Sequence, residues 1–154
     1  MNFLVKLVGS FLFTGYFPFA PATFASLVFS LIYLFVPGGE WLANPWVLLG
    51  TLIVSIPVST RLEKQYGKDP SVAVIDEVVG MQVVLVLAEP TLVGVALGFF
   101  LFRVFDVLKP PPVARSQTLP GGWGIVIDDF LAGIYTRIVM ILIALLFPVV
   151  GRFL

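Results

Sequence analysis

Charged residues inside a very apolar chain are the features of this sequence that could do chemistry. One stretch, residues 103–133, carries an Arg, a Lys and three Asp residues on two apolar arms. A shorter stretch at residues 75–78 adds an Asp–Glu pair. A charge at membrane depth costs roughly 2.5–3.5 kcal/mol or more, so such residues usually face a polar interior and mark a working site. We interpret the two stretches as halves of one site.

The acids of the two stretches suggest a metal site. They are Asp76, Glu77, Asp106, Asp128 and Asp129. Favourable charge in a first helical turn explains one such pair, but several acids close together repel one another and take up protons. A divalent cation removes that repulsion. Because the chain contains no His and no Cys, the ligands must be oxygens, which indicates Mg²⁺, Mn²⁺ or Ca²⁺ rather than Zn²⁺.

Two cations flank one of these acids at helical spacing. Arg103 lies three residues before Asp106 and Lys109 three residues after it, so the three share a broad helix face. An internal ladder of salt bridges is one explanation. The other is a phosphate-handling site, in which Arg and Lys stabilise charge on a phosphoryl group while the metal polarises it.

Two further segments could bring backbone N–H groups to a phosphate. Thr23 and Ser26 follow Pro18 and Pro21 at the start of a predicted helix, where they either cap the helix or line an anion site. The glycine-rich residues 121–124 either approach the phosphate or form a flexible turn.

Composition places the chain in a membrane. Of 154 residues, 59% are hydrophobic and 12% are charged, and the mean hydropathy is +1.07, whereas a soluble domain is about 25% charged. The net charge of +0 gives no support for nucleic-acid binding. The length suits one domain, residues 1–154. We predict an all-α fold: a small polytopic membrane bundle of about five spanning or partly embedded helices, plus an N-terminal interfacial helix.

The expected elements follow from the apolar runs and the prolines between them. Residues 2–14 form an interfacial helix or, as the alternative, a signal peptide. Asp69 before Pro70 is the expected N-cap of the third spanning segment. The predicted helices cover residues 23–36, 46–62, 71–88, 91–108 and 123–149, the last starting at 123 or 127.

Loop charges predict the orientation and argue for a single site. The basic loops should be cytoplasmic, and they contain Arg61, Lys64, Lys68, Lys109 and Arg115. With five spans, this orientation places Thr23 and the five acids of the suggested metal site at cytoplasmic helix ends. The main alternative is a small ion or proton transporter, which would stagger its carboxylates in depth. A non-catalytic assembly subunit gives no reason for the acids to cluster.

Several motifs resemble the phosphatidylglycerophosphatase A family over nearly the whole chain. They are Ala20-Pro-Ala-Thr-Phe-Ala-Ser26, Asp69-Pro70 followed by Val74-Ile-Asp-Glu-Val-Val-Gly80, Arg103-Val-Phe-Asp106 with Lys109-Pro-x-Pro112, and Gly121-Gly-Trp-Gly-Ile-Val-Ile-Asp-Asp129 with Ala132-Gly133. Ala22 and Ala25 stand where the family usually has glycine.

The resemblance implies an enzyme and its site. The family removes the terminal phosphate of phosphatidylglycerophosphate in a Mg²⁺-dependent reaction, which gives phosphatidylglycerol, at the bacterial inner membrane. The multi-pass chain would bind the lipid bilayer and this phospholipid, with its active site facing the cytoplasm. By resemblance, Asp76, Glu77, Asp106, Asp128 and Asp129 would bind metal and act in catalysis. Thr23, Ser26, Arg103 and Lys109 would hold phosphate, and Asp69 would lie just outside the metal ligands.

Overall fold

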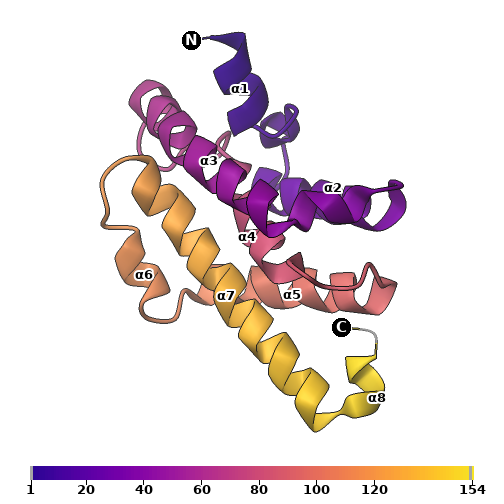
Figure 1. Cartoon of the computed structure of the whole chain (residues 1–154). Helices are drawn as coiled ribbons and strands as arrows, with labels where there is room; N and C mark the ends of the chain where they lie inside the picture. Colours follow the sequence, from indigo (N-terminus) through magenta and orange to yellow (C-terminus); the bar gives the residue numbers. More distant parts are fainter. Residues whose placement is uncertain (1, 153) are drawn as a thin grey trace.

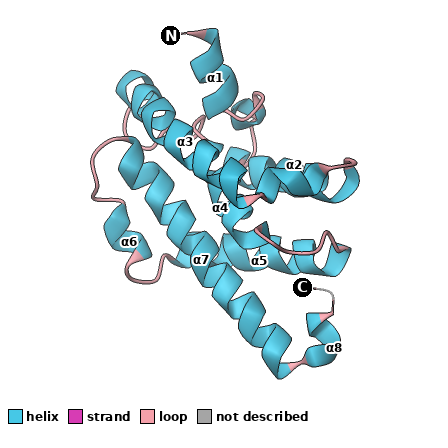
Figure 2. Ribbon diagram, in the orientation of Figure 1, coloured by secondary structure: helices cyan, strands magenta, loops and turns pink. Residues whose placement is uncertain are grey.

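A computed structural model describes residues 2–152 and 154, and all regular elements in this part of the chain are helical (Figures 1 and 2). Two short 3-10 helices, η1 (Thr14–Tyr16) and η2 (Gly39–Ala43), flank the second α-helix. The α-helices are α1 (Phe3–Gly9), α2 (Pro21–Phe35), α3 (Pro45–Tyr66), α4 (Ile75–Leu85), α5 (Leu92–Leu108), α6 (Val113–Ser116), α7 (Gly122–Leu146) and α8 (Pro148–Gly151). The all-α prediction is confirmed.

The short helix α4 lies at the centre of the molecule (Figure 1). It packs against α2, α3, α5 and α7, and all of its 11 residues are buried. Apart from Asp76, Glu77 and Gln82, its residues are apolar or glycine, and a helix that is hydrophobic on all sides is expected to be buried. Its acidic pair, Asp76 and Glu77, therefore starts inside the protein, at the end where α4 begins.

Two glycines allow α4 and α7 to approach closely. A Cβ atom added to Gly133 of α7 would lie 2.6 Å from the backbone oxygen of Gly80 of α4. Small residues at a helix crossing let two backbones come together in this way. Asp129 lies one turn before Gly133, and Asp76 lies one turn before Gly80. The crossing thus draws the acids of the two helices toward each other.

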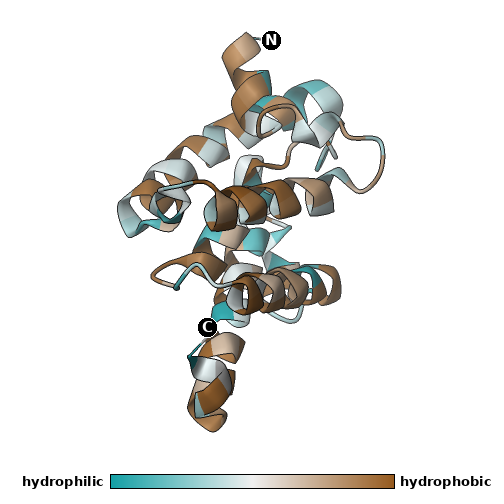
Figure 3. Ribbon diagram, turned by 90° about the vertical axis from the view of Figure 1, so that its right-hand side faces the viewer, coloured by the Kyte–Doolittle hydropathy of each residue, from teal (hydrophilic) through white to brown (hydrophobic). Residues whose placement is uncertain are grey.

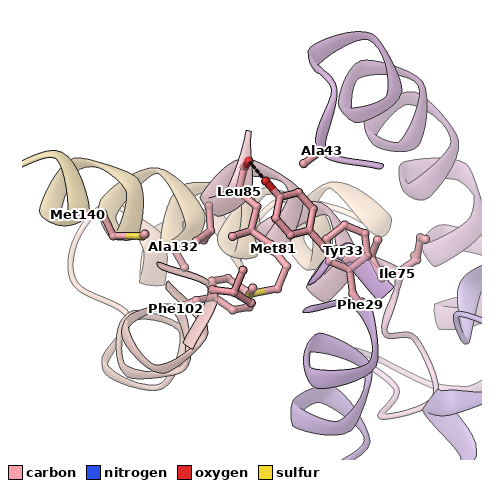
Figure 4. Packing of buried hydrophobic residues seen from close by; sticks show 12 residues of the cluster. Phe29, Tyr33, Ala43, Ile75, Met81, Leu85, Phe102, Ala132 and Met140 are labelled. Atoms are coloured by element: carbon pink, nitrogen blue, oxygen red, sulfur yellow. Dashed lines mark hydrogen bonds between the residues drawn. The ribbon is translucent and has the colours of Figure 1, made fainter. Parts of the chain in front are cut away.

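A hydrophobic cluster packs α4 against α2, α5 and α7 (Figure 4). Phe29 and Tyr33 from α2, Met81 from α4, Phe102 from α5 and Met140 from α7 are all fully buried in it. The Tyr33 hydroxyl donates a hydrogen bond to the Ala88 backbone oxygen at 2.6 Å and lies 3.5 Å from that of Leu85. This cluster holds the helices in the arrangement that sets the acids in place.

Two helices, α3 and α7, are long and apolar enough to cross a membrane. Hydrophobic residues cover much of the helix surfaces (Figure 3), and many are exposed, including Phe35, Trp46, Phe100 and Leu145. The exposed aromatic residues Trp41, in η2, and Trp46, in the first turn of α3, lie close together in the sequence, as is typical of a membrane interface.

Several predicted boundaries differ from the structure. The helix expected over residues 2–14 ends at Gly9, and the three residues Phe11–Phe13 that follow it have positive φ. The prediction that Asp69 caps the third segment is wrong, because α4 starts only at Ile75 and its N-cap residue is Val74. Asp69 instead has φ 47° in the loop before it. Ala22 and Ala25 lie in α2 without positive φ, so the missing glycines impose no strain there.

Candidate active site

The ends of four helices meet around one cavity of about 410 Å³. The start of α2 contributes Pro21 and Ala22, while α4, the end of α5 and the first turns of α7 contribute the charged groups. The predicted site residues that line it are Asp69, Asp76, Glu77, Arg103, Asp106, Lys109, Asp128 and Asp129. The two stretches that the sequence singled out are therefore brought together.

Three carboxylates form a compact group within this cavity. One oxygen from each of Glu77, Asp106 and Asp129 lies within 4.8 Å of the others. Asp76 and Asp128 line the same cavity, outside this group of three. Glu77 and Asp129 are buried and Asp106 is half-buried, so water screens their mutual repulsion only weakly.

Buried carboxylate oxygens without hydrogen-bond partners support a cation at this place. Within the described part of the chain, Asp76 Oδ1, Asp128 Oδ1 and Asp129 Oδ2 are buried and have no hydrogen-bond partner. Leaving a buried charged acceptor unpaired costs more than about 1–3 kcal/mol. A hard divalent cation takes oxygen ligands and supplies the missing positive charge. The donor set therefore fits a metal ion of this class.

Arg103 links two helices through two carboxylates. Its Nη1 donates to Glu77 Oε2 of α4, and its Nη2 donates to Asp106 Oδ2 of its own helix at 2.8 Å. Nη1 also donates to Ser26 Oγ at 3.4 Å. The second N–H of Nη2 can still donate to an anion in the cavity while the guanidinium holds these acids. The salt-bridge explanation and the phosphate explanation for Arg103 are therefore compatible.

Lys109 links the end of α5 to α7. It ends α5 in the left-handed region, with φ 44°, and its Nζ lies 2.6 Å from Asp128 Oδ2 and 3.8 Å from Asp106 Oδ1. Burial alone would lower the pKa of Lys109, but the hydrogen bond to Asp128 and the nearby carboxylates outweigh it and raise that pKa above its usual value. The ammonium group therefore stays charged at neutral pH.

The two hydroxyl residues predicted to hold phosphate, Thr23 and Ser26 of α2, do not line the cavity. Thr23 is half-buried, and neither it nor Ser26 belongs to the described residues that line the cavity. Ser26 is fully buried and donates to Glu77 Oε2 at 3.1 Å and to the Ala22 backbone oxygen at 3.0 Å. In this position Ser26 orients Glu77.

Gln117 is a contact that the sequence analysis missed. Its Nε2 donates to Asp128 Oδ2 at 2.9 Å, beside the Lys109 bond to the same oxygen. A glutamine in a polar loop carries no sequence signal for such a role, because the contact depends on how the loop folds back on α7.

The glycine-rich turn packs against α3. The Gly122 N–H donates to Thr60 Oγ1 at 2.8 Å, and a Cβ on Gly122 would lie 2.8 Å from the Thr60 nitrogen. These glycines therefore allow α7 to start directly against α3, and the Gly122 N–H is already engaged there.

Comparisons with known proteins point to one family. The family model described as phosphatidylglycerophosphatase A matches residues 7–144. A Bacteroides thetaiotaomicron protein named "Putative phosphatidylinositol-3-phosphatase" is 37% identical over 149 residues, which cover 90% of this chain and 92% of the relative. No solved structure matches the chain.

Two relatives carry the family's own name. The phosphatidylglycerophosphatase A of Escherichia coli is 33% identical over 128 residues, covering 79% of this chain and 72% of the relative. That of Haemophilus influenzae is 47% identical over 68 residues, covering 42% of this chain and 41% of the relative. Together with the family model, these matches show that the chain belongs to the phosphatidylglycerophosphatase A family.

Proposed function

We propose that this protein is a Mg²⁺-dependent lipid phosphatase that converts phosphatidylglycerophosphate to phosphatidylglycerol and inorganic phosphate. The observation that carries the proposal is the cavity in which three carboxylates lie within 4.8 Å of one another, beside Arg103 and Lys109. A hard cation held by these carboxylates, next to two fixed positive groups, is well placed to bind a phosphate monoester. Family membership supports the same activity.

The residues would divide the work as follows. Glu77, Asp106 and Asp129 would hold the metal ion, with Asp76 and Asp128 beside them. When bound, Mg²⁺ supplies a Lewis acid for the phosphoryl group and lowers the pKa of bound water. Arg103 and Lys109 would orient the phosphate and stabilise its negative charge. Hydrolysis joins a water oxygen to phosphorus and breaks the ester bond, and the departing alcohol takes up a proton.

Ser26 and Thr23 would assist phosphate binding from α2 without lining the cavity themselves. The start of α2 borders the cavity through Pro21 and Ala22, and the positive end of a helix attracts anions. Asp69 also lines the cavity, outside the compact group of carboxylates, and would lie just outside the metal ligands.

The site would lie at the cytoplasmic face of a bacterial inner membrane. We propose that residues 1–154 form one membrane-embedded domain, with α2, α3, α4, α5 and α7 spanning or partly embedded and α1 at the interface. A phospholipid could then place its headgroup in the cavity while its acyl chains stay in the bilayer. The acids gather at one end of their helices, which supports an enzyme over a transporter with carboxylates at successive depths.

One assay tests the activity directly. Purified protein is given phosphatidylglycerophosphate with and without Mg²⁺, and released phosphate is measured. We expect release that needs the metal, and release that is equally fast with chelator would contradict the metal role. Because the Bacteroides relative's name refers to phosphatidylinositol 3-phosphate, that lipid is the second candidate substrate and belongs in the same assay.

Labelling tests the orientation. Cysteine placed at Lys68, in the basic loop, should react from the cytoplasmic side, and cysteine placed at Glu40 should react from the opposite side. The natural chain has no Cys, so single-cysteine variants give an unmixed signal. Reaction of both from the same side would contradict the proposed topology.

A further inference from the structure

A second cavity, of about 360 Å³, adjoins the carboxylate cavity. Glu63 and Lys68, at and beyond the end of α3, and Leu119, in the loop before α7, belong to its wall. Asp69 lines both cavities. Gln117 also lines the second one and donates to Asp128 in the first. The two cavities therefore share a wall at Asp69, and a ligand bound at the carboxylates lies next to this second space.

The groups around the second cavity are free to meet a ligand. Within the described part of the chain, the charged ends of Glu63, Lys68 and Asp69 make no ion pair. Their carboxylates accept hydrogen bonds, an ammonium donates them, and a glutamine amide does both. Hydroxyl groups, which donate and accept, match this mixture. A second phosphate matches it less well, because two carboxylates against one ammonium would repel an anion.

The position of Gln117 is fixed by close packing of its loop on α7. A Cβ on Gly124 would lie 2.6 Å from the Leu119 backbone oxygen and 3.1 Å from that of Gln117. The loop therefore rests directly on the first turn of α7. With its Nε2 on Asp128, Gln117 keeps its amide oxygen as an acceptor at the boundary of the two cavities.

We propose that this second cavity binds the polyol of the lipid headgroup, the hydroxyl-bearing unit to which the scissile phosphate is attached. Glu63 and Lys68 would then be specificity-determining residues. This inference rests on the phosphatase function proposed above. Glycerol and inositol share the required chemistry and differ in their number of free hydroxyls, so the substrates of the test distinguish them.

The test compares lipids with and without a polyol headgroup. Glu63→Ala and Lys68→Ala are assayed with Mg²⁺ on phosphatidylglycerophosphate, on phosphatidylinositol 3-phosphate, and on two phosphate monoesters without a polyol, phosphatidic acid and p-nitrophenyl phosphate. Loss of one hydrogen bond should lower kcat/KM by about fivefold on the polyol lipid that is the substrate. The polyol-free esters and the Mg²⁺ affinity should be unchanged.

Lys64→Ala is the matched control, because Lys64 is an exposed cation in the last turn of α3, next to Glu63 and outside this cavity. It should leave all rates unchanged. Equal losses on polyol-bearing and polyol-free esters would overturn the inference, and so would rates on the polyol lipids equal to wild type. A faster rate for Glu63→Ala on the polyol lipids would also overturn it, since the cavity would then hold an anion. Failure of the wild type on every ester would instead contradict the phosphatase function.

Discussion

The two ends of α4 both bury polar side chains, but they satisfy them differently. Near its C-terminal end, Gln82 Nε2 donates to the Leu42 backbone oxygen at 2.7 Å, and Tyr33 donates to that of Ala88. At this end of α4, Gln82 Oε1 is buried without a hydrogen-bond partner among the described residues. At the other end, Asp76 Oδ1 and two further aspartate oxygens are buried without partners, close to other acids. Satisfied groups stabilise a fold, whereas unsatisfied charges cost stability and point to function.

The largest expected effect comes from neutralising the acidic end. Asp76→Asn, Asp106→Asn and Asp128→Asn should each lower phosphatase activity by about a hundredfold or more, because each replaces a charged group of the cavity by a neutral one of similar shape. Without metal, Asp76→Asn should keep or raise thermal stability, since one repelling charge is removed. Asp106→Asn and Asp128→Asn should gain less, because each also weakens an ion pair, to Arg103 or to Lys109. Phosphate release and melting temperature are measured together. A variant that keeps full activity would remove its residue from the site.

Arg103→Lys should cause the second largest loss of phosphatase activity. Lys keeps the charge but cannot reproduce the two-pronged contact to Glu77 and Asp106 or a bidentate grip on phosphate. We expect nearly normal Mg²⁺ affinity and turnover lower by about tenfold to a hundredfold, with Arg103→Ala worse still. Recovery of the full rate at high Mg²⁺ would instead make Arg103 an organiser of the metal ligands.

Gly133→Ala tests whether the helix crossing sets the acids. The added methyl would press on the Gly80 backbone oxygen, and such overpacking costs about 1–3 kcal/mol of stability. Pushing α7 away from α4 should also weaken Mg²⁺ binding by separating Asp129 from Glu77. Calorimetry of Mg²⁺ binding measures this. Gly50→Ala is the control, because a Cβ at Gly50 meets nothing within 4 Å. This variant should bind Mg²⁺ normally.

At the C-terminal end of α4, Tyr33→Phe should affect only the stability of the fold. The change removes the hydroxyl that donates to the Ala88 backbone oxygen, at a cost of about 1 kcal/mol. Activity per folded molecule should equal that of the wild type. A large loss of turnover in fully folded protein would show that the two ends are coupled.

The smallest effects are expected in the turns at this end. Glu40 and Glu89 are exposed, and neither is among the described residues that line the carboxylate cavity. Glu40→Gln and Glu89→Gln should leave phosphate release within error of the wild type. A clear loss in either variant would mean that acidity matters across the whole molecule, and the contrast between the two ends would fail.

The sequence predicted the composition of the site better than its contacts. Asp76, Asp106 and Asp128 were predictable because charge is rare in apolar segments. The order of the helices, with the orientation that the loop charges indicate, also predicts that the three acids lie at the same end of their helices. The position of Ser26 against Glu77 and of Gln117 against Asp128 depends on tertiary packing, which leaves no local pattern.

Element boundaries show the same limit. The end of α1 at Gly9 is followed by three residues of positive φ, although residues 2–14 read as one apolar run. The start of α4 at Ile75 is set by contacts rather than by a capping side chain, because Val74 makes no side-chain cap. Apolar runs predicted the presence of the helices, and tertiary contacts decided where they begin and end.

The shortness of α4 has a consequence for biogenesis. Its 11 residues extend only about 16 Å, roughly half of the hydrocarbon thickness of a bilayer, and they start with two acids. Membrane insertion machinery accepts segments according to length and apolarity, so α4 would be rejected if presented alone. In the proposed arrangement, α4 can enter the membrane only together with its neighbours α3 and α5. Asp76 and Glu77 would then enter the membrane only after the flanking helices have formed a protein-lined space for them.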